Sequence, residues 1–220
     1  VGSEMCIRDS WSVDDVDSKP YRRRPPAPFT TSSLQQEASR KLRLNSRDTM
    51  RVAQSLYENG YITYMRTDSV NLSEQAISAA RSLAVSRFGK DAVPAKPRIY
   101  ETKTKGAQEA HEAIRPAGEQ FQLPSSLEGK LNAREWKLYN LIFRRTLACQ
   151  MNDATGTTVS VKIAAVPADG SVQAEFGASG TVIENPGFLA AYEEGRDEGD
   201  EPAVTSGGGK TGEARLPRMQ

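Results

Sequence analysis

Apolar residues recur at helical spacing in two stretches after residue 30, and each stretch carries signals for a helix end. The first helix begins at Thr30, where Ser33 and Gln36 form a capping-box pattern. The second helix follows Ser46 and ends at Gly60, because glycine readily adopts the left-handed conformation that closes a helix. We expect the buried side of this second helix to consist of Met50, Ala53, Leu56 and Tyr57.

Two further helices complete a mostly helical region. One is capped by Ser73 and ends at Gly89. The other begins at Asn132, with Glu135 at the third helical position, and ends near Cys149. The apolar stripe of this last helix consists of Trp136, Tyr139, Phe143 and Leu147.

The remaining stretches differ from helices in their period. Residues 90–117 follow neither the helical nor the strand period, so we expect a long irregular segment there. Residues 158–163 and 172–183 alternate as strands do, with a hairpin signal at Asp169-Gly170 between them. A short polar strand is expected within residues 11–27. Two strands are marginal alone, so we expect a larger sheet and an α+β fold.

Composition excludes several classes of protein. The 220 residues contain no apolar run of about 18, which argues against a membrane span. Cys6 and Cys149 lie far apart in the sequence, which suits a reducing cytosol and argues against a disulfide framework. With His111 as the only histidine, a structural zinc site within the chain is not expected.

The net charge of +1 conceals an asymmetry along the chain. Residues 21–66 contain nine Lys/Arg against three acidic residues, a balance of +6, whereas residues 184–201 contain seven acidic residues against Arg196 alone, a balance of −6. A basic region such as residues 21–66 suits binding to the negatively charged phosphodiester backbone of a nucleic acid. Charge runs are also common on solvated faces, so this pattern supports nucleic-acid binding without establishing it.

Candidate chemistry is concentrated in residues 60–69, GYITYMRTDS. If residues 61–66 are extended, the side chains of Tyr64 and Arg66 point to the same side. A phenol is a weak nucleophile, so a covalent role needs a partner that balances charge on the attacked group, and a guanidinium binds phosphate oxygens in this way. On spacing alone, a buried edge strand with a hydrogen-bonded tyrosine is the more common explanation.

Three segments, in the same order, resemble the bacterial type IA DNA topoisomerases. They are PFTTSSLQQE at residues 28–37, GYITYMRTDS at 60–69 followed by NLS at 71–73, and QEAHEAIRP at 108–116. The three motifs together are very specific for this family. The linker and residues 21–24 are more similar to actinobacterial members of its topoisomerase I branch.

The resemblance implies a transesterification. Tyr64 would attack a backbone phosphorus of single-stranded DNA and form a 5′-phosphotyrosine link, while Arg66 would hold the scissile phosphate. The DNA-binding residues that it implies are Arg66, Asp68, His111 and Arg115. For Asp68, a local cap is an equally good explanation. For Arg115 and Glu112, an ion pair with a structural role is an equally good explanation.

The resemblance also implies a helical, tyrosine-bearing domain inserted in a β-rich arch. We therefore expect the first arch segment to end within residues 11–27, the active-site domain to cover 28–149, and the returning strands with an acidic, Gly-rich loop to cover 150–220. Residues 1–10 include MCIRDS, which resembles a translated sequencing adapter, so we expect a non-native or disordered leader there.

Members of the family bind Mg²⁺ through acidic residues of a Toprim domain and use no ATP. No DxDxD cluster occurs in this chain, so we expect no metal site within it, and we expect an internal fragment that is inactive alone. Gly207 to Thr211 lack the first glycine of a P-loop. The complete enzyme is expected to be a monomeric, cytoplasmic and nucleoid-associated protein that relaxes negatively supercoiled DNA. Two alternatives remain open: a fragment of a topoisomerase III-type decatenase, and a non-catalytic single-stranded DNA-binding module.

Overall fold

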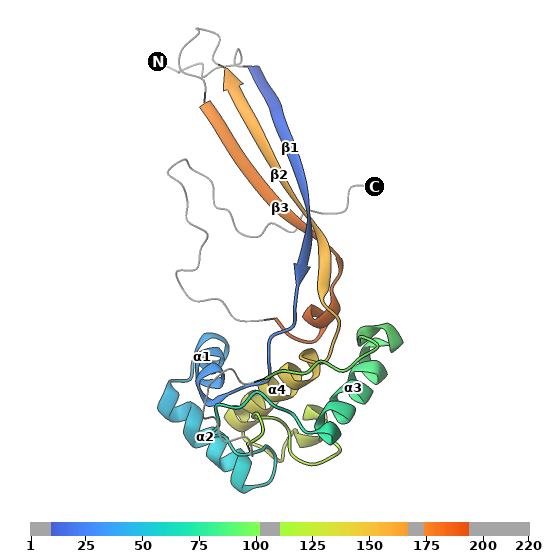
Figure 1. Cartoon of the computed structure of the whole chain (residues 1–220). Coiled ribbons are helices and arrows are strands. Elements are labelled where there is room, and N and C mark those ends of the chain that lie inside the picture. The colour runs from blue at the N-terminus through green and yellow to red at the C-terminus, as the bar shows by residue number, and fades with distance from the viewer. Residues whose placement is uncertain (1–9, 102–110, 167–173, 194–220) are drawn as a thin grey trace, which may run out of the picture. The chain divides into compact units, whose positions relative to one another are not determined.

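The computed structural model describes residues 10–101, 111–166 and 174–193, and the chain divides into two compact units. Among the described residues, one unit combines residues 10–23, 155–166 and 174–185, and the other combines residues 24–101, 111–154 and 186–193. The first unit is a sheet and the second is mostly helical (Figure 1), which confirms the α+β class. The hairpin signal at 169–170, the leader up to residue 9 and the Gly-rich 207–211 lie outside the described residues.

The sheet unit has three strands in the order β1-β2-β3. They are β1 (Ser10–Arg23), β2 (Ala154–Val166) and β3 (Ala174–Asn185), and β2 and β3 are antiparallel. The strand expected within residues 11–27 is therefore present as β1, which is 14 residues long. A register shift lies at Thr155/Gly156, where a Cβ on Gly156 would collide with the carbonyl oxygen of Val182.

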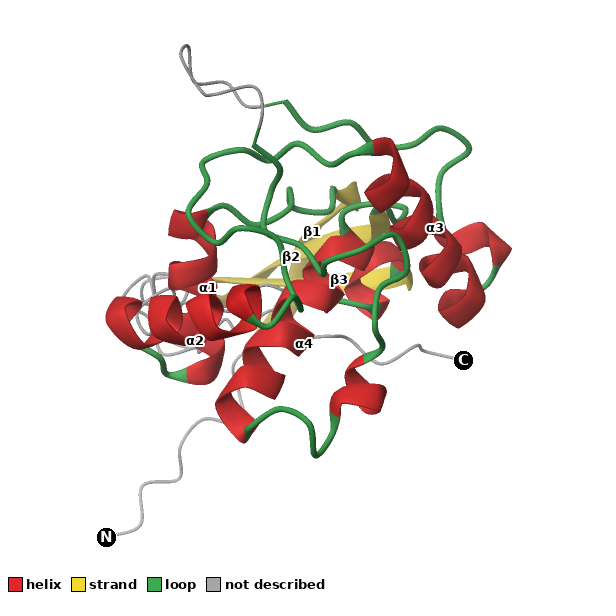
Figure 2. Cartoon of the chain, turned by 90° about the horizontal axis from the view of Figure 1, so that it is seen from below, coloured by secondary structure: helices red, strands yellow, loops and turns green. Residues whose placement is uncertain are grey.

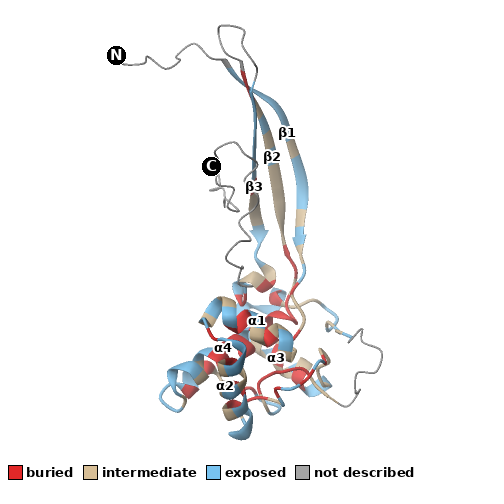
Figure 3. Ribbon diagram, turned by 90° about the vertical axis from the view of Figure 1, so that its left-hand side faces the viewer, coloured by how far each residue is buried: buried red, intermediate tan, exposed pale blue. Residues whose placement is uncertain are grey.

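The helical unit contains α1 (Thr31–Leu42), α2 (Ser46–Glu58), α3 (Glu74–Phe88) and α4 (Ala133–Ala148). Short 3₁₀ turns cover Lys90–Ala92, Pro124–Leu127 and Gly187–Ala190. Helix α4 packs against the other three helices, and residues of most of its circumference are buried. Figure 2 shows these helices with the loops between them, and Figure 3 shows that buried residues gather in this unit. In the described part of the chain no helix is long and apolar enough to cross a membrane.

The expected helix ends are largely confirmed. Ser73 caps α3, and Asn132 forms a capping box with Glu135 at the start of α4. The first helix differs in detail, because Thr30 is the N-cap and forms its capping box with Ser33 rather than through Gln36.

The predicted burial of Tyr57 is wrong, because its side chain is 42% exposed. The ring follows Leu56, which faces the core, and each helical step turns the side chain by about 100°. At the last turn of α2 this rotation carries Tyr57 out of the interface. Its ring instead contacts Tyr64, which lies on the loop after α2.

The segment after β3 does not continue the sheet. All of residues 150–220 are expected to belong with the returning strands, whereas residues 186–193 pack within the helical unit. Phe188 and Tyr192 are buried there. The Tyr192 hydroxyl donates to the carboxylate of Glu37 over 2.6 Å and accepts from Arg145 over 3.1 Å. Burial raises the pKa of Tyr192, so this phenol stays protonated and keeps donating.

Candidate functional site

The segment that carries Tyr64 is a loop rather than the extended strand that the spacing predicted. It pairs with a neighbouring segment through one isolated bridge, Ile62 to Pro116. The Thr63 N–H donates to the Arg115 carbonyl oxygen over 2.9 Å, as in a ladder. The Arg115 N–H, however, donates to the Thr63 hydroxyl over 3.0 Å. Because a side-chain hydroxyl takes this backbone donor, the regular ladder stops here.

Side chains along this loop nevertheless alternate as expected. Tyr64 is 41% exposed, and Arg66 and Asp68 are also exposed. Met65 between them is 4% exposed and packs into the core, and the Thr63 hydroxyl donates to the Ala113 carbonyl oxygen over 2.8 Å. The exposure of Tyr64 argues against the alternative of a buried edge-strand tyrosine.

A pocket of about 530 Å³ lies beside the loop, and Arg66, Asp68 and His111 all contribute to its walls. The full lining is Thr31, Ser32, Gln35, Arg66, Thr67, Asp68 and His111. The structure thus brings together three of the predicted site residues, because His111 lies beside the segment that carries Arg66 and Asp68, more than 40 positions earlier in the sequence. Tyr64 does not line this pocket; its ring lies edge-on against Tyr57.

Three pocket residues come from the first turns of α1 and were given no role from the sequence. They are Thr31, Ser32 and Gln35. Their position in the PFTTSSLQQE segment was the one sequence feature that could have pointed to them. The spacing of residues within this helix does not predict that it lies beside Arg66. The hydroxyl of Ser32 and the amide of Gln35, beside a guanidinium at a helix N-terminus, favour the binding of an anion such as a phosphate.

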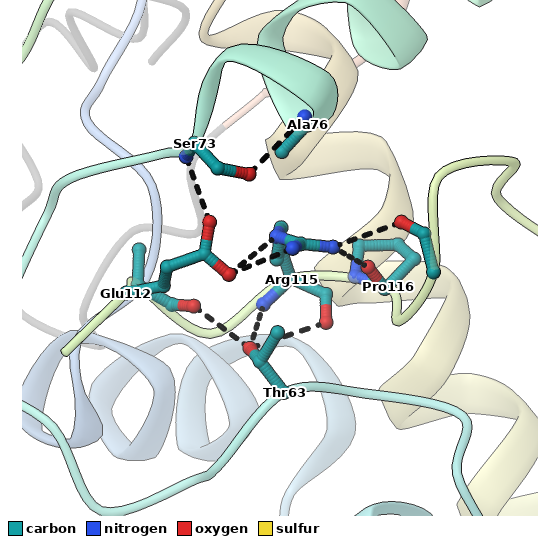
Figure 4. A network of polar contacts seen from close by, with 8 residues as sticks. Thr63, Ser73, Ala76, Glu112, Arg115 and Pro116 are labelled. Atoms are coloured by element: carbon teal, nitrogen blue, oxygen red, sulfur yellow. Dashed lines mark hydrogen bonds and ion pairs between the residues drawn. The ribbon is translucent and has the colours of Figure 1, made fainter.

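Arg115 lies apart from the pocket, in a network of polar contacts (Figure 4). Its guanidinium donates through Nε and Nη2 to one carboxylate oxygen of Glu112, over 3.2 and 2.7 Å. Its Nη1 donates to the carbonyl oxygens of Pro116 and Gly118, over 2.8 and 3.1 Å. The residue is 8% exposed, and the ion pair with Glu112 that would give it a structural role is present. A contact of Arg115 with DNA stays a prediction.

Glu112 connects this network to the start of α3. Its second carboxylate oxygen accepts from the backbone N–H of Ser73, the N-cap residue, over 2.7 Å. Burial alone would raise the pKa of Glu112, but hydrogen bonds from Ser73 and Arg115 outweigh it and lower the pKa below its usual range. The ionised carboxylate therefore joins the segment that contains Glu112 and Arg115 to the N-terminus of α3.

The residues of the structure do not fit a resident metal ion. No group of three His, Cys, Asp or Glu that could hold one occurs among the residues that the structure describes. Burial raises the pKa of the Cys149 thiol to about 12, so this cysteine remains a neutral, inert group.

Comparison with known proteins gives concordant results. A family profile described as DNA topoisomerase matches residues 4–216, a range that begins within the expected leader. DNA topoisomerase 1 of Mycolicibacterium smegmatis is 54% identical over 208 residues, which cover 94% of this chain and 22% of that protein. DNA topoisomerase 1 of Streptomyces coelicolor is 56% identical over 188 residues, which cover 86% of this chain and 19% of that protein.

A solved structure is similar as well. Full-length topoisomerase I from Thermotoga maritima matches with a TM-score of 0.66 and 32% identity, over 86% of this chain and 32% of that one. The chain spans about a fifth of the length of the two curated relatives described above. The profile, the relatives and the solved structure agree, and the chain therefore belongs to the bacterial type IA DNA topoisomerase family, where it resembles topoisomerase I.

Proposed function

We propose that the full-length protein cleaves and rejoins single-stranded DNA through a covalent 5′-phosphotyrosine at Tyr64. The observation that carries this proposal is the exposed phenol of Tyr64, two residues before Arg66, which lines a polar pocket with Asp68 and His111. Family membership supports the same chemistry.

In the proposed reaction the Tyr64 hydroxyl oxygen attacks a backbone phosphorus. A bond forms between this oxygen and phosphorus, the bond from phosphorus to the 3′-oxygen breaks, and the phenol proton leaves while the 3′-oxygen gains one. Arg66 donates to the non-bridging oxygens, whose negative charge grows in the transition state. His111 contacts the DNA phosphate, and Asp68 orients His111 or Arg66.

Rejoining is the reverse of this step, so no ATP is consumed. One phosphate ester is exchanged for another, and the energy of the cleaved bond is kept in the phosphotyrosine. We propose that the full-length protein relaxes negatively supercoiled DNA as a monomer in the cytoplasm, in association with the nucleoid. Any Mg²⁺ would be held by a Toprim domain outside this chain, and no step proposed for these residues passes through it.

Residues 1–220 alone would not relax DNA. We expect them to bind single-stranded DNA with a dissociation constant in the micromolar range or above, and the affinity should fall steeply as salt rises, because phosphate contacts release counterions. Relaxation of a supercoiled plasmid by this chain alone, in the presence of Mg²⁺, would contradict the expectation.

The decisive test is adduct formation with the full-length protein and an oligonucleotide labelled at its 3′ end. The unaltered protein should become covalently labelled, since a 5′-phosphotyrosine retains the DNA on the 3′ side of the break. Tyr64→Phe should give no adduct but keep its non-covalent affinity within a few-fold, because it loses one hydroxyl. The matched control is Tyr57→Phe, an equally exposed tyrosine on the neighbouring helix, which should still form the adduct.

An adduct on the Tyr64→Phe variant would overturn the assignment of the nucleophile. If the unaltered protein binds single-stranded DNA but never forms an adduct, the non-catalytic binding module becomes the better description.

A further inference from the structure

We propose that Thr31 is a positioning residue that sets the backbone on both sides of Arg66 and so directs its guanidinium into the pocket. This inference rests on the proposed function of Arg66. Thr31 is the first residue of α1 and comes from a segment 35 positions earlier in the chain.

The hydroxyl and the backbone N–H of Thr31 make the contacts with the residues on either side of Arg66. The Thr31 hydroxyl donates to the carbonyl oxygen of Met65 over 2.8 Å and accepts from the N–H of Thr67 over 2.9 Å. The Thr31 N–H donates to the carbonyl oxygen of Thr67, also over 2.9 Å. The residues on either side of Arg66 are thus bound by a single residue of α1.

These bonds matter because residues 65–67 form a loop rather than part of a ladder. Met65 and Thr67 are buried, whereas Arg66 between them is exposed. A loop residue with two anchored neighbours has little freedom to rotate about its backbone, and its side chain leaves the loop in one direction. The hydroxyl of Thr31 therefore replaces the strand pairing that would otherwise fix this direction.

Thr31 is itself held firmly. The preceding Thr30 caps α1 and forms a capping box with Ser33. Phe29 is fully buried, and its carbonyl oxygen accepts from the Ile114 N–H over 2.8 Å. Thr31 also lines the pocket, together with its helix neighbours Ser32 and Gln35. The same helix therefore positions Arg66 and forms part of the pocket wall.

The test compares Thr31→Val with Thr31→Ser in the full-length protein. Valine keeps the shape but removes both the donor and the acceptor, whereas serine keeps them. We expect Thr31→Val to slow single-turnover cleavage of an oligonucleotide by about ten- to a hundredfold, because small misplacements of a catalytic group have such effects. Non-covalent affinity should stay within about threefold, and Thr31→Ser should restore most of the rate.

The matched control is Thr146→Val. Thr146 is a buried threonine whose hydroxyl donates to the Ile142 carbonyl oxygen within α4, away from the loop. This variant should cleave normally. Thr31→Ala serves as a second loss of the hydroxyl, and hydrogen exchange of peptides outside residues 61–69 verifies that each variant is folded.

A double-mutant cycle with Arg66→Ala separates positioning from general stability. If Thr31 acts through Arg66, Thr31→Val should cause no further loss in the Arg66→Ala background. A normal rate for both Thr31→Val and Thr31→Ala would overturn the inference, and so would the same fold loss with and without Arg66. Either result leaves the proposed function intact, because that function fails if Tyr64→Phe still forms the adduct or if the unaltered protein never forms one.

Discussion

The ring of Tyr57 meets the ring of Tyr64 edge-on, with centroids 5.2 Å apart and an angle of 66° between the ring planes. The two residues come from different elements, since Tyr57 belongs to the last turn of α2 and Tyr64 to the loop that follows. Both rings are partly exposed, so the contact supports the proposed nucleophile without burying it.

This contact predicts a moderate effect of Tyr57→Ala on cleavage. An aromatic pair contributes about 0.5–1.5 kcal/mol, so loss of the ring should slow adduct formation by up to about tenfold without abolishing it. Tyr57→Phe keeps the ring and should be nearly normal. A normal single-turnover rate for Tyr57→Ala would show that the contact does not orient Tyr64.

Arg66→Ala should have a larger effect. Removing a charged group that contacts the reacting phosphate should slow single-turnover cleavage by roughly 10² or more, and Arg66→Lys should restore only part of it, because an ammonium lacks the planar fork. Arg51→Ala removes an exposed arginine from α2 that does not line the pocket, so it controls for net charge. Cleavage by Arg66→Ala at the rate of the Arg51→Ala control would leave Arg66 with a structural role only.

Glu112→Gln should loosen residues 111–117 in a pH-dependent way. The folded-state pKa of Glu112 is lowered, so its ionised form stabilises the fold above the unfolded value of about 4, and this contribution is lost as the pH falls through the folded pKa. We expect a loss of about 1 kcal/mol of local stability at neutral pH, kept small by partial exposure.

Hydrogen exchange of the full-length protein, corrected for intrinsic rates, measures this loss. Glu112→Gln should exchange faster than the unaltered protein at pH 7, and the difference should shrink only as the pH falls through the lowered folded-state pKa of Glu112. The exposed Glu128 provides the control substitution Glu128→Gln. A difference that stays constant across this range would mean that the charge of Glu112 is not responsible.

Local signals predicted the helices well and the loop poorly. The start of α4 follows from Asn132 and Glu135, which satisfy one another within a single turn. The path of residues 61–66, by contrast, depends on hydroxyl groups that intercept backbone donors. Whether Thr63 bonds to Arg115, 52 positions away, cannot be inferred from spacing within either segment.

The site followed a similar division. The alternation that exposes Tyr64 and Arg66 follows from their positions two residues apart. The meeting of Arg66 with His111 depends on tertiary packing, and only the family resemblance suggested it. The contribution of α1 to the same pocket was not predicted. For Arg115, the ion pair with Glu112 was one of the two roles expected from the sequence, whereas the two carbonyl oxygens that also accept from its guanidinium depend on the tertiary structure.

The central claim is that Tyr64 is the residue that joins covalently to DNA. Adducts of the full-length protein can be trapped with denaturant, trimmed with nuclease and digested with trypsin, which cuts after Arg51 and Arg66. The resulting peptide, residues 52–66, contains Tyr57, Tyr61 and Tyr64, so fragment ions in mass spectrometry must distinguish among three tyrosines. We expect the nucleotide on Tyr64 alone; a nucleotide on Tyr57 or Tyr61, or on any other peptide, would contradict the assignment.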